Sequence, residues 1–338
     1  MTEPVDWRVY RGYGEPHDGF ARLPEAPPWR RFNGELPAVE PLRPEIEPAL
    51  PPGLAERARS YRPGAKIVEA ANAAMLLRRP LLVTGRPGTG KSSLALSIAY
   101  ELQLGPVLHW PVTSRSQLQE ALYRYDAIGR LQETNLYRSG ETDPVAPIGR
   151  YLRLGPLGTA LLPRERPRVL LIDELDKSDV DLPNDLLNVF EEGQFEIPEL
   201  ARLVDAASVE VGTADPGVTA VVENGVVRCN EFPIVVITNN SEREFPPAFL
   251  RRCLRITVEP PDSETLTEIV RAQLGTPATE RAAEVIARFK TLSQHSVLAI
   301  DQLLNAVYLA TTIDVDDPQV QGRLLDDIFA PLTWNQPD

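Results

Sequence analysis

LLVTGRPGTGKS, residues 81–92, is the stretch that decides the fold of this chain. Its first three residues are an apolar run, which predicts a buried strand. The following GRPGTGKS, from Gly85 to Ser92, fits the pattern G-x-x-x-x-G-K-[ST]. Apolar residues then recur at helical spacing, at Leu94, Ala95, Ile98, Ala99 and Leu102. A strand, a glycine loop and a helix in this order predict a loop that binds phosphate groups.

The residue types of this loop suit that chemistry. Glycines let backbone N–H groups curl around phosphate oxygens, and the N-terminus of the following helix adds its positive end. Lys91 would reach the β- and γ-phosphates of a nucleotide, and Ser92 would ligate Mg²⁺. We expect the nucleotide to be held by Gly85, Pro87, Gly88, Thr89, Gly90, Lys91, Ser92 and Ser93.

Two carboxylates follow a second apolar run, RVLLIDE, at residues 168–174. The run predicts a buried strand that delivers Asp173 and Glu174 to the carboxyl edge of a sheet, where open α/β sheets place their ligands. We expect Asp173 to hold Mg²⁺, directly or through water, and so to belong to both the nucleotide site and the metal site. Glu174 would orient and polarise the attacking water.

Composition limits the function classes. The chain has 338 residues, 43% of them hydrophobic, and a formal net charge of −13, which argues against a protein that mainly coats DNA or an anionic membrane. No apolar run approaches the roughly 20 residues of a membrane span, and the first residues carry no apolar signal core. Cys229 and Cys253 form no metal spacing, and we expect two reduced or buried thiols. These features favour the cytoplasm.

Residues 1–60 are rich in proline and charge, which predicts little sustained helix. Aromatic residues nevertheless punctuate the segment, at Trp7, Tyr10, Tyr13, Phe20, Trp29 and Phe32. Plain disordered linkers are usually poor in aromatics, so we interpret the segment as an extended arm docked on a protein surface. A flexible leader is the alternative.

Alternating strands and helices after this arm predict a parallel sheet flanked by helices. PVLHW (106–110), FPIVVIT (232–238) and residues 254–258 predict further strands, and we interpret His109 as a structural strand residue. Residues 115–123 predict a helix, 125–153 lack strong periodicity, and Asn224-Gly225 predicts a tight hairpin within a β-rich insertion. Beyond Pro260-Pro261 the pattern is purely helical.

The chain resembles the AAA+ ATPases, and within them the MoxR-type branch. NAAMLLRRPLLVTGRPGTGKSSLA, VLLIDELDKSDVDLPNDLLNVFEEGQFEIPE and VVITNNSEREFPPAFLRRCL carry the resemblance, which covers roughly residues 61–310. It implies that residues 81–92 are Walker A, that Asp173 and Glu174 are Walker B, and that Asn240 is the sensor-1 residue. Arg252, with Arg251 as a neighbouring candidate, would be the arginine finger offered to the adjacent subunit's nucleotide.

The resemblance also implies a domain organisation. Residues 1–60 would be the arm, and residues 61–260 the α/β nucleotide-binding domain with inserts at about 124–153 and 194–230. Residues 261–338 would be an all-α lid. In the family these inserts face the pore or the client. The family's sensor-2 arginine has no counterpart in the stretch 292–300, where His295 is the nearest candidate and a surface or N-cap histidine is the plainer interpretation.

The function implied by the resemblance is ATP hydrolysis with Mg²⁺ in a homo-oligomeric ring, of which a hexamer is the expected form. Such a ring would remodel or activate a partner protein, with a von Willebrand factor A domain partner acting in trans. One alternative is a nucleic-acid-directed motor of the McrB type, with arginines of the first insert lining a basic pore; the acidic net charge disfavours it. A non-hydrolysing switch or scaffold, and a small-molecule P-loop kinase, are further alternatives.

Overall fold

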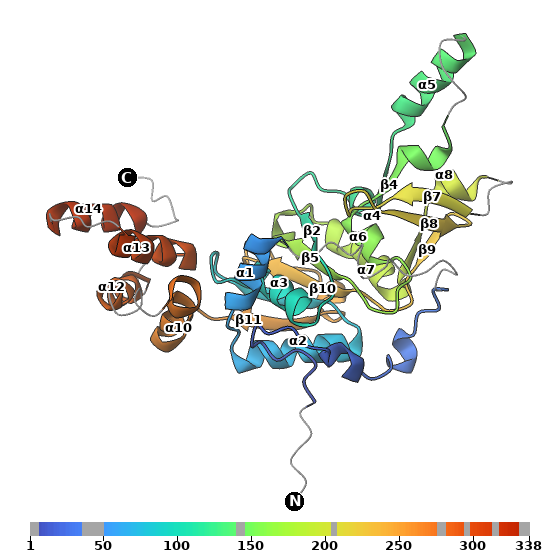
Figure 1. Cartoon of the computed structure of the whole chain (residues 1–338). Helices are drawn as coiled ribbons and strands as arrows, with labels where there is room; N and C mark the ends of the chain where they lie inside the picture. The colour runs from blue at the N-terminus through green and yellow to red at the C-terminus, as the bar shows by residue number, and fades with distance from the viewer. Residues whose placement is uncertain are drawn as a thin grey trace, which may run out of the picture.

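A five-stranded parallel sheet forms the centre of the computed structural model, which describes residues 7–35, 51–139, 146–203, 208–275, 282–293, 298–312 and 318–330 (Figure 1). Its strand order is β11-β1-β10-β5-β2. The strands are β1 (Leu81–Gly85), β2 (Leu108–Pro111), β5 (Val169–Asp173), β10 (Ile234–Asn239) and β11 (Leu254–Val258). Each pairs in parallel with its neighbours, which confirms the predicted α/β class.

The two faces of this sheet are buried by different helices. Leu81 and Val83 of β1 pack with α2 (Ala65–Leu77) and α3 (Lys91–Glu101), whereas Leu82 joins the hydrophobic cluster on the other face. That second cluster includes α6 (Pro156–Ala160), α7 (Leu182–Glu192) and α9 (Pro247–Leu250). Alternate side chains of a strand point to opposite faces, so a continuous apolar run is what a sheet covered on both sides requires.

The β-rich insertion forms a second sheet together with two strands, β3 and β4, that flank the first insert. Its strand order is β3-β4-β7-β8-β9-β6. The strands are β3 (Tyr123–Tyr125), β4 (Leu152–Leu154), β6 (Gln194–Glu196), β7 (Ser208–Gly212), β8 (Thr219–Glu223) and β9 (Val226–Arg228). The predicted Asn224-Gly225 hairpin is confirmed: both residues have positive φ, and Glu223 pairs with Val226 across the turn.

The first insert differs from its prediction. The helix expected at 115–123 is the shorter α4 (Leu118–Leu122), because Tyr123 already begins β3. The stretch without periodicity contains a 13-residue helix, α5 (Ala127–Ser139), which projects away from the body of the molecule (Figure 1). Four of its apolar side chains are exposed: Ile128, Leu131, Leu136 and Tyr137. The helix contacts residues 148–151 at its base, and a helix that is otherwise exposed needs no continuous apolar stripe, so its sequence lacks a strong helical period.

The C-terminal helices have a hydrophobic cluster of their own. They are α10 (Ser263–Leu274), α12 (Ala283–Ser293), α13 (Ile300–Thr312) and α14 (Pro318–Ile328). Apolar side chains of all four helices meet in that cluster, to which α14 contributes Leu325. The backbone N–H of Ile300 donates to the carbonyl of Gly88, 3.2 Å away, so this helical unit touches the glycine loop. No described helix is long and apolar enough to cross a membrane.

The N-terminal arm is docked along its described residues, 7–35. Tyr10 is fully buried, and its hydroxyl lies 2.8 Å from that of Ser97 on α3. The amide of Asn72 on α2 accepts from the backbone N–H groups of Val9 and Tyr10. The side chains of Trp7, Tyr13 and Trp29 are exposed. Only some of the aromatic residues that suggested docking therefore contribute to it.

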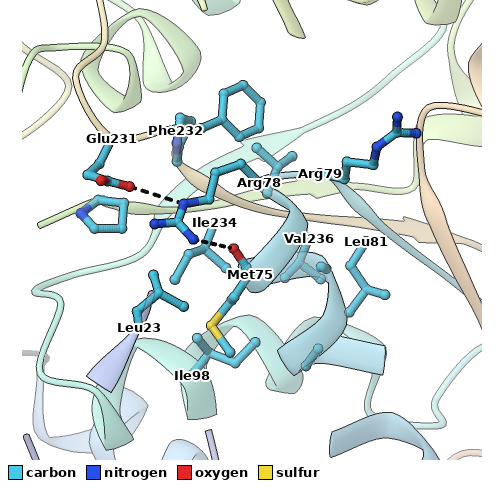
Figure 2. Close-up of a pocket in the computed structure, with 15 residues that line it drawn as sticks. Leu23, Met75, Arg78, Arg79, Leu81, Ile98, Glu231, Phe232, Ile234 and Val236 are labelled. Carbon is cyan, nitrogen blue, oxygen red and sulfur yellow. Dashed lines mark hydrogen bonds and ion pairs between the residues drawn. The ribbon is translucent and has the colours of Figure 1, made fainter. Parts of the chain in front are cut away.

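The arm also contains short helices and contacts the end of α2. It contains the short 3₁₀ helices η1 (Gly19–Arg22) and η2 (Pro28–Arg30), and helix α1 (Pro52–Ser60) follows and packs on α3. Arg78, in a left-handed conformation after α2, donates to Glu231 and to the carbonyl of Met75 (Figure 2). It also donates to the carbonyl of Pro24 in the arm. The cavity in Figure 2 holds only about 10 Å³, too little for a ligand.

The remaining elements are short. They are η3 (Ile148–Tyr151), η4 (Leu175–Lys177) and α8 (Pro198–Ala201).

Candidate nucleotide site

Three neighbouring strands end at the same edge of the parallel sheet. Thr84 of β1 pairs with Asn239 of β10, and Ile237 of β10 pairs with Ile172 of β5. The glycine loop, the two carboxylates and Asn240 each lie at the end of one of these strands or directly after it. The carboxyl edge of the sheet therefore collects them, as expected for an open α/β sheet.

The glycine loop has the backbone needed to curl around an anion. Gly88 and Gly90 both have positive φ, at 75° and 82°. At Gly88 a Cβ atom would lie 2.1 Å from that of Ala299, so a side chain there would also push the C-terminal helices away. The loop leads into the N-terminus of α3, where unpaired N–H groups and the helix dipole favour negative charge.

Lys91 is buried and all three of its donors are engaged. Its Nζ donates to the carbonyls of Gly85 (2.8 Å) and Arg86 (2.9 Å) and to Oδ1 of Asn240 (2.7 Å). Burial lowers the pKa of Lys91, opposed by the nearby carboxylates of Asp176, Glu174 and Asp173. A phosphate would give this buried cation a full counter-charge, which carbonyl oxygens alone do not.

Asp173 accepts hydrogen bonds on both carboxylate oxygens. Ser92 (2.8 Å) and Thr238 (2.7 Å) donate their hydroxyls to Oδ1, and Nε2 of His109 lies 3.3 Å from Oδ2. Burial raises the pKa of Asp173, but these hydrogen bonds outweigh it and hold the pKa at about 2. The carboxylate is therefore ionised at neutral pH and adjoins a serine hydroxyl, an oxygen donor set that suits Mg²⁺.

The described residues hold no cluster of three or more His, Cys, Asp or Glu side chains placed to bind a metal. Ser92 and Asp173, whose side chains are hydrogen-bonded to each other, could hold a magnesium ion, with phosphate and water supplying its other ligands.

Glu174 is held at both ends. Its backbone is left-handed (φ 60°) and its N–H donates to the hydroxyl of Thr238, 2.7 Å away. Oε1 accepts from the Asn240 amide at 3.2 Å, and Oε2 accepts from Lys177 at 2.6 Å. The bond to Glu174 raises the pKa of Lys177. Asn240 thus bridges Lys91 and Glu174, joining the candidate phosphate-binding lysine to the candidate water-activating carboxylate.

Asp176 also belongs to this site, although it was not among the residues predicted from the sequence. It is buried, and Oδ2 accepts from the backbone N–H groups of Asn240 (2.9 Å) and Glu242 (3.1 Å). Its Oδ1 is buried without a partner among the described residues. Asp176 therefore fixes the turn that presents Asn240. In the sequence Asp176 is the third acid of DELD (173–176), and an acid at that position could equally cap the next helix, so the pattern alone did not identify it.

His109 lies in strand β2, as predicted, and adds a contact to the candidate site. Its side chain is half exposed rather than packed in the sheet, and Nε2 faces the carboxylate of Asp173. β2 is an edge strand with an alternating burial pattern, so one of its faces is open. The sequence could have shown this alternation, since His109 lies between the buried Leu108 and Trp110.

The family model of the AAA domain (dynein-related subfamily) matches residues 80–253, just over half of the chain. The chain belongs to this AAA family. No curated protein matches it in sequence. Among solved structures it is similar to domain III of the Thermotoga maritima replication initiation protein DnaA, with 20% identity and a TM-score of 0.43. That match covers 84% of this chain and 100% of the DnaA chain.

Arg252 of this AAA domain lies away from the other candidate site residues. β11 begins opposite Leu81 and ends opposite Gly85, so Arg252, just before β11, is at the amino edge of the sheet. The length of β11 alone separates it from the glycine loop by about 13 Å, at about 3.3 Å per residue. Arg252 donates from Nε to Glu191 (2.7 Å) and from Nη1 to the carbonyl of Ala248 (3.1 Å).

Two further candidates remain: Arg251 for the arginine finger and His295 for the sensor-2 position. Arg251 is exposed, and its carbonyl accepts from Arg79. His295, the nearest candidate for the missing sensor-2 arginine, lies outside the described residues.

Proposed function

We propose that this AAA protein is a MoxR-like ATP hydrolase that works as a ring, of which a hexamer is the expected form. The ring would remodel or activate a partner protein, with a von Willebrand factor A domain partner in trans. One observation carries the catalytic part of the proposal: the hydrogen-bonded line from Lys91 through Asn240 to Glu174. It links a cation for the phosphates, a polar sensor and a carboxylate for water, which is the minimum that phosphoryl transfer to water needs.

The roles follow from chemistry at each position. Residues 85–93 would cradle the phosphates of ATP with backbone N–H groups, and Lys91 would exchange its carbonyl partners for phosphate oxygens. Ser92 and Asp173 would hold Mg²⁺, which supplies charge neutralisation on the phosphates when bound. Glu174 would orient the attacking water and accept its proton, and Asn240 would fix the position of Glu174.

The position of Arg252 supports the proposed ring. A cation at the amino edge of the sheet cannot serve its own glycine loop at the carboxyl edge. A head-to-tail contact could bring it to a neighbour's nucleotide, and such contacts close into rings when the rotation permits. A planar guanidinium there would neutralise charge on the transferred phosphoryl oxygens.

The partner protein would bind to the two inserts of the nucleotide-binding domain. We propose residues 1–60 as the arm, 61–260 as the nucleotide-binding domain with inserts at 124–153 and 194–230, and 261–338 as the lid. The exposed apolar side chains of α5 support a protein-binding role for the first insert. The proposed compartment is the cytoplasm.

Two variants test the catalytic part. Lys91→Ala should lose ATP binding, because the buried cation is the principal partner of the phosphates. Glu174→Gln should bind ATP normally and hydrolyse it at least about 100-fold more slowly, because an amide cannot accept the proton of water. Equilibrium binding of fluorescent ATP and steady-state phosphate release measure the two steps. Hydrolysis by Glu174→Gln at the wild-type rate would contradict the assignment of Glu174.

A further inference from the structure

The candidate arginine finger has an acidic partner that none of the assigned roles uses. Arg252 donates from Nε to Oε1 of Glu191, near the end of α7, at 2.7 Å. Its Nη1 donates to the carbonyl of Ala248, one turn earlier in the chain. Nη2 makes no hydrogen bond within the described part of the chain, so that end of the guanidinium is available for a ligand. The side chain is thus held at Nε and at Nη1, while Nη2 keeps its donors without a partner among the described residues.

The other oxygen of Glu191 faces the N-terminal arm. Arg30 Nη1 lies 3.6 Å from Oε2. Arg30 itself is buried: Nε and Nη2 donate to the carbonyl of Arg78, and Nη1 donates to that of Phe190. Its guanidinium also lies 4.9 Å and 4.8 Å from the ring centres of Phe32 and Phe232. The arm therefore presents a cation that the core holds in one place.

These contacts form one line from the arm to the finger. Arg30 is held by the core, Glu191 lies between two arginines, and Nη2 of Arg252 has no hydrogen-bond partner among the described residues. Carboxylate–guanidinium contacts restrict orientation as well as adding attraction. At the surface such a pair contributes little to folding stability, so orientation is the use that its geometry favours.

We propose that Glu191 is a positioning residue for Arg252, and that the docked arm braces Glu191 through Arg30. This inference rests on the proposed function, in which Arg252 acts on a neighbouring subunit's nucleotide. Without the carboxylate, the guanidinium samples several rotamers and meets the phosphoryl oxygens in fewer productive encounters. A misplacement of about 1 Å can cost up to 100-fold in rate, so we expect roughly a tenfold loss.

A mixed-ring assay isolates the finger. Cradle donors carry Arg252→Ala and keep an intact nucleotide site, whereas finger donors carry Lys91→Ala and keep an intact Arg252. Activity of the mixture then comes from interfaces between the two kinds of subunit. Glu191→Gln is added to the finger donors, with Glu192→Gln as the matched control, since Glu192 is the exposed neighbour on the same helix. Size-exclusion chromatography normalises each mixture to the assembled complex.

The proposal expects kcat of the mixture to fall roughly tenfold with Glu191→Gln finger donors, while KM for ATP is unchanged. Glu192→Gln donors should match the unmodified donors, and Glu191→Asp donors should recover part of the loss. Glu191→Gln placed instead in the cradle donors should have no effect, because the finger of those subunits is already absent.

Two results would overturn this role of Glu191: unchanged activity, or an equal loss with the change in either kind of subunit, which would mean a general structural effect. A different result, no activity in the mixture of unmodified donors, would refute the trans finger itself and hence the proposed function.

Discussion

Glu101 anchors the N-terminal arm, and its replacement by glutamine tests that docking. The carboxylate is fully buried at the end of α3. Oε1 accepts from the backbone N–H groups of Arg11 and Gly12 and lies 3.0 Å from Nε2 of His17. Oε2 accepts from the backbone N–H groups that follow, those of residues 13 and 14, at 2.9 and 3.2 Å.

The amide of Glu101→Gln has only one acceptor oxygen. Whichever way it turns, its NH₂ group faces two backbone donors that lose their partner. Each unsatisfied buried donor costs about 1–3 kcal/mol, so the arm's docking free energy should weaken by about 4 kcal/mol. That corresponds to roughly a thousandfold larger population with the arm open, at about 1.4 kcal/mol per factor of ten.

Hydrogen exchange measures this directly, because the four backbone amides of residues 11–14 donate to Glu101. Their protection should fall by about two to three orders of magnitude in Glu101→Gln, while the amides of β1 and β5 keep theirs. Glu69→Gln, at an exposed position on α2, is the matched control. Wild-type protection at residues 11–14 in Glu101→Gln would refute the reasoning that this carboxylate holds the arm.

Three other predictions concern the site and its alternatives. The pKa of Asp173 is about 2 in the folded protein, below its unfolded value, so its contribution to stability is complete above about pH 4 and is lost as the pH falls through 2. The difference in unfolding free energy between the wild type and Asp173→Asn should therefore shrink between about pH 4 and 2, as measured by urea titrations. Asp176→Ala should lower kcat about tenfold with little change in ATP affinity, since it frees the turn that presents Asn240; an unchanged kcat in steady-state assays would show that the turn holds without it. Filter binding at 50 and 200 mM salt should detect no ATP-dependent DNA binding; tight binding that weakens steeply with salt would instead favour the nucleic-acid motor.

Local patterns predicted the parts of this fold that local chemistry determines. The strands of the central sheet are short continuous apolar runs, and the structure has β11 at the predicted residues. The glycine loop and Asp173–Glu174 are neighbours in sequence of the strands that position them, so their convergence follows from the parallel sheet alone. Asn240 follows the same logic at the end of β10.

The features that the sequence did not reveal depend on contacts between distant segments. Asn72 and Glu101 are polar residues within apolar helices, and the arm, some 60 to 90 positions earlier, gives their side-chain oxygens their partners. The pairing of Arg252 with Glu191 likewise joins residues 61 positions apart. No spacing rule within a helix or strand could have found these pairs, because the tertiary fold creates them.

The most direct measurement of the central claim is the specific ATPase activity of the wild-type protein across a range of protein concentrations, beside that of Arg252→Ala. If catalysis needs an arginine from a neighbouring subunit, specific activity rises with concentration and levels off as assembly completes. Arg252→Ala then stays on the order of 10³-fold lower at every concentration. Specific activity that is independent of concentration, with Arg252→Ala equal to the wild type, would contradict the account.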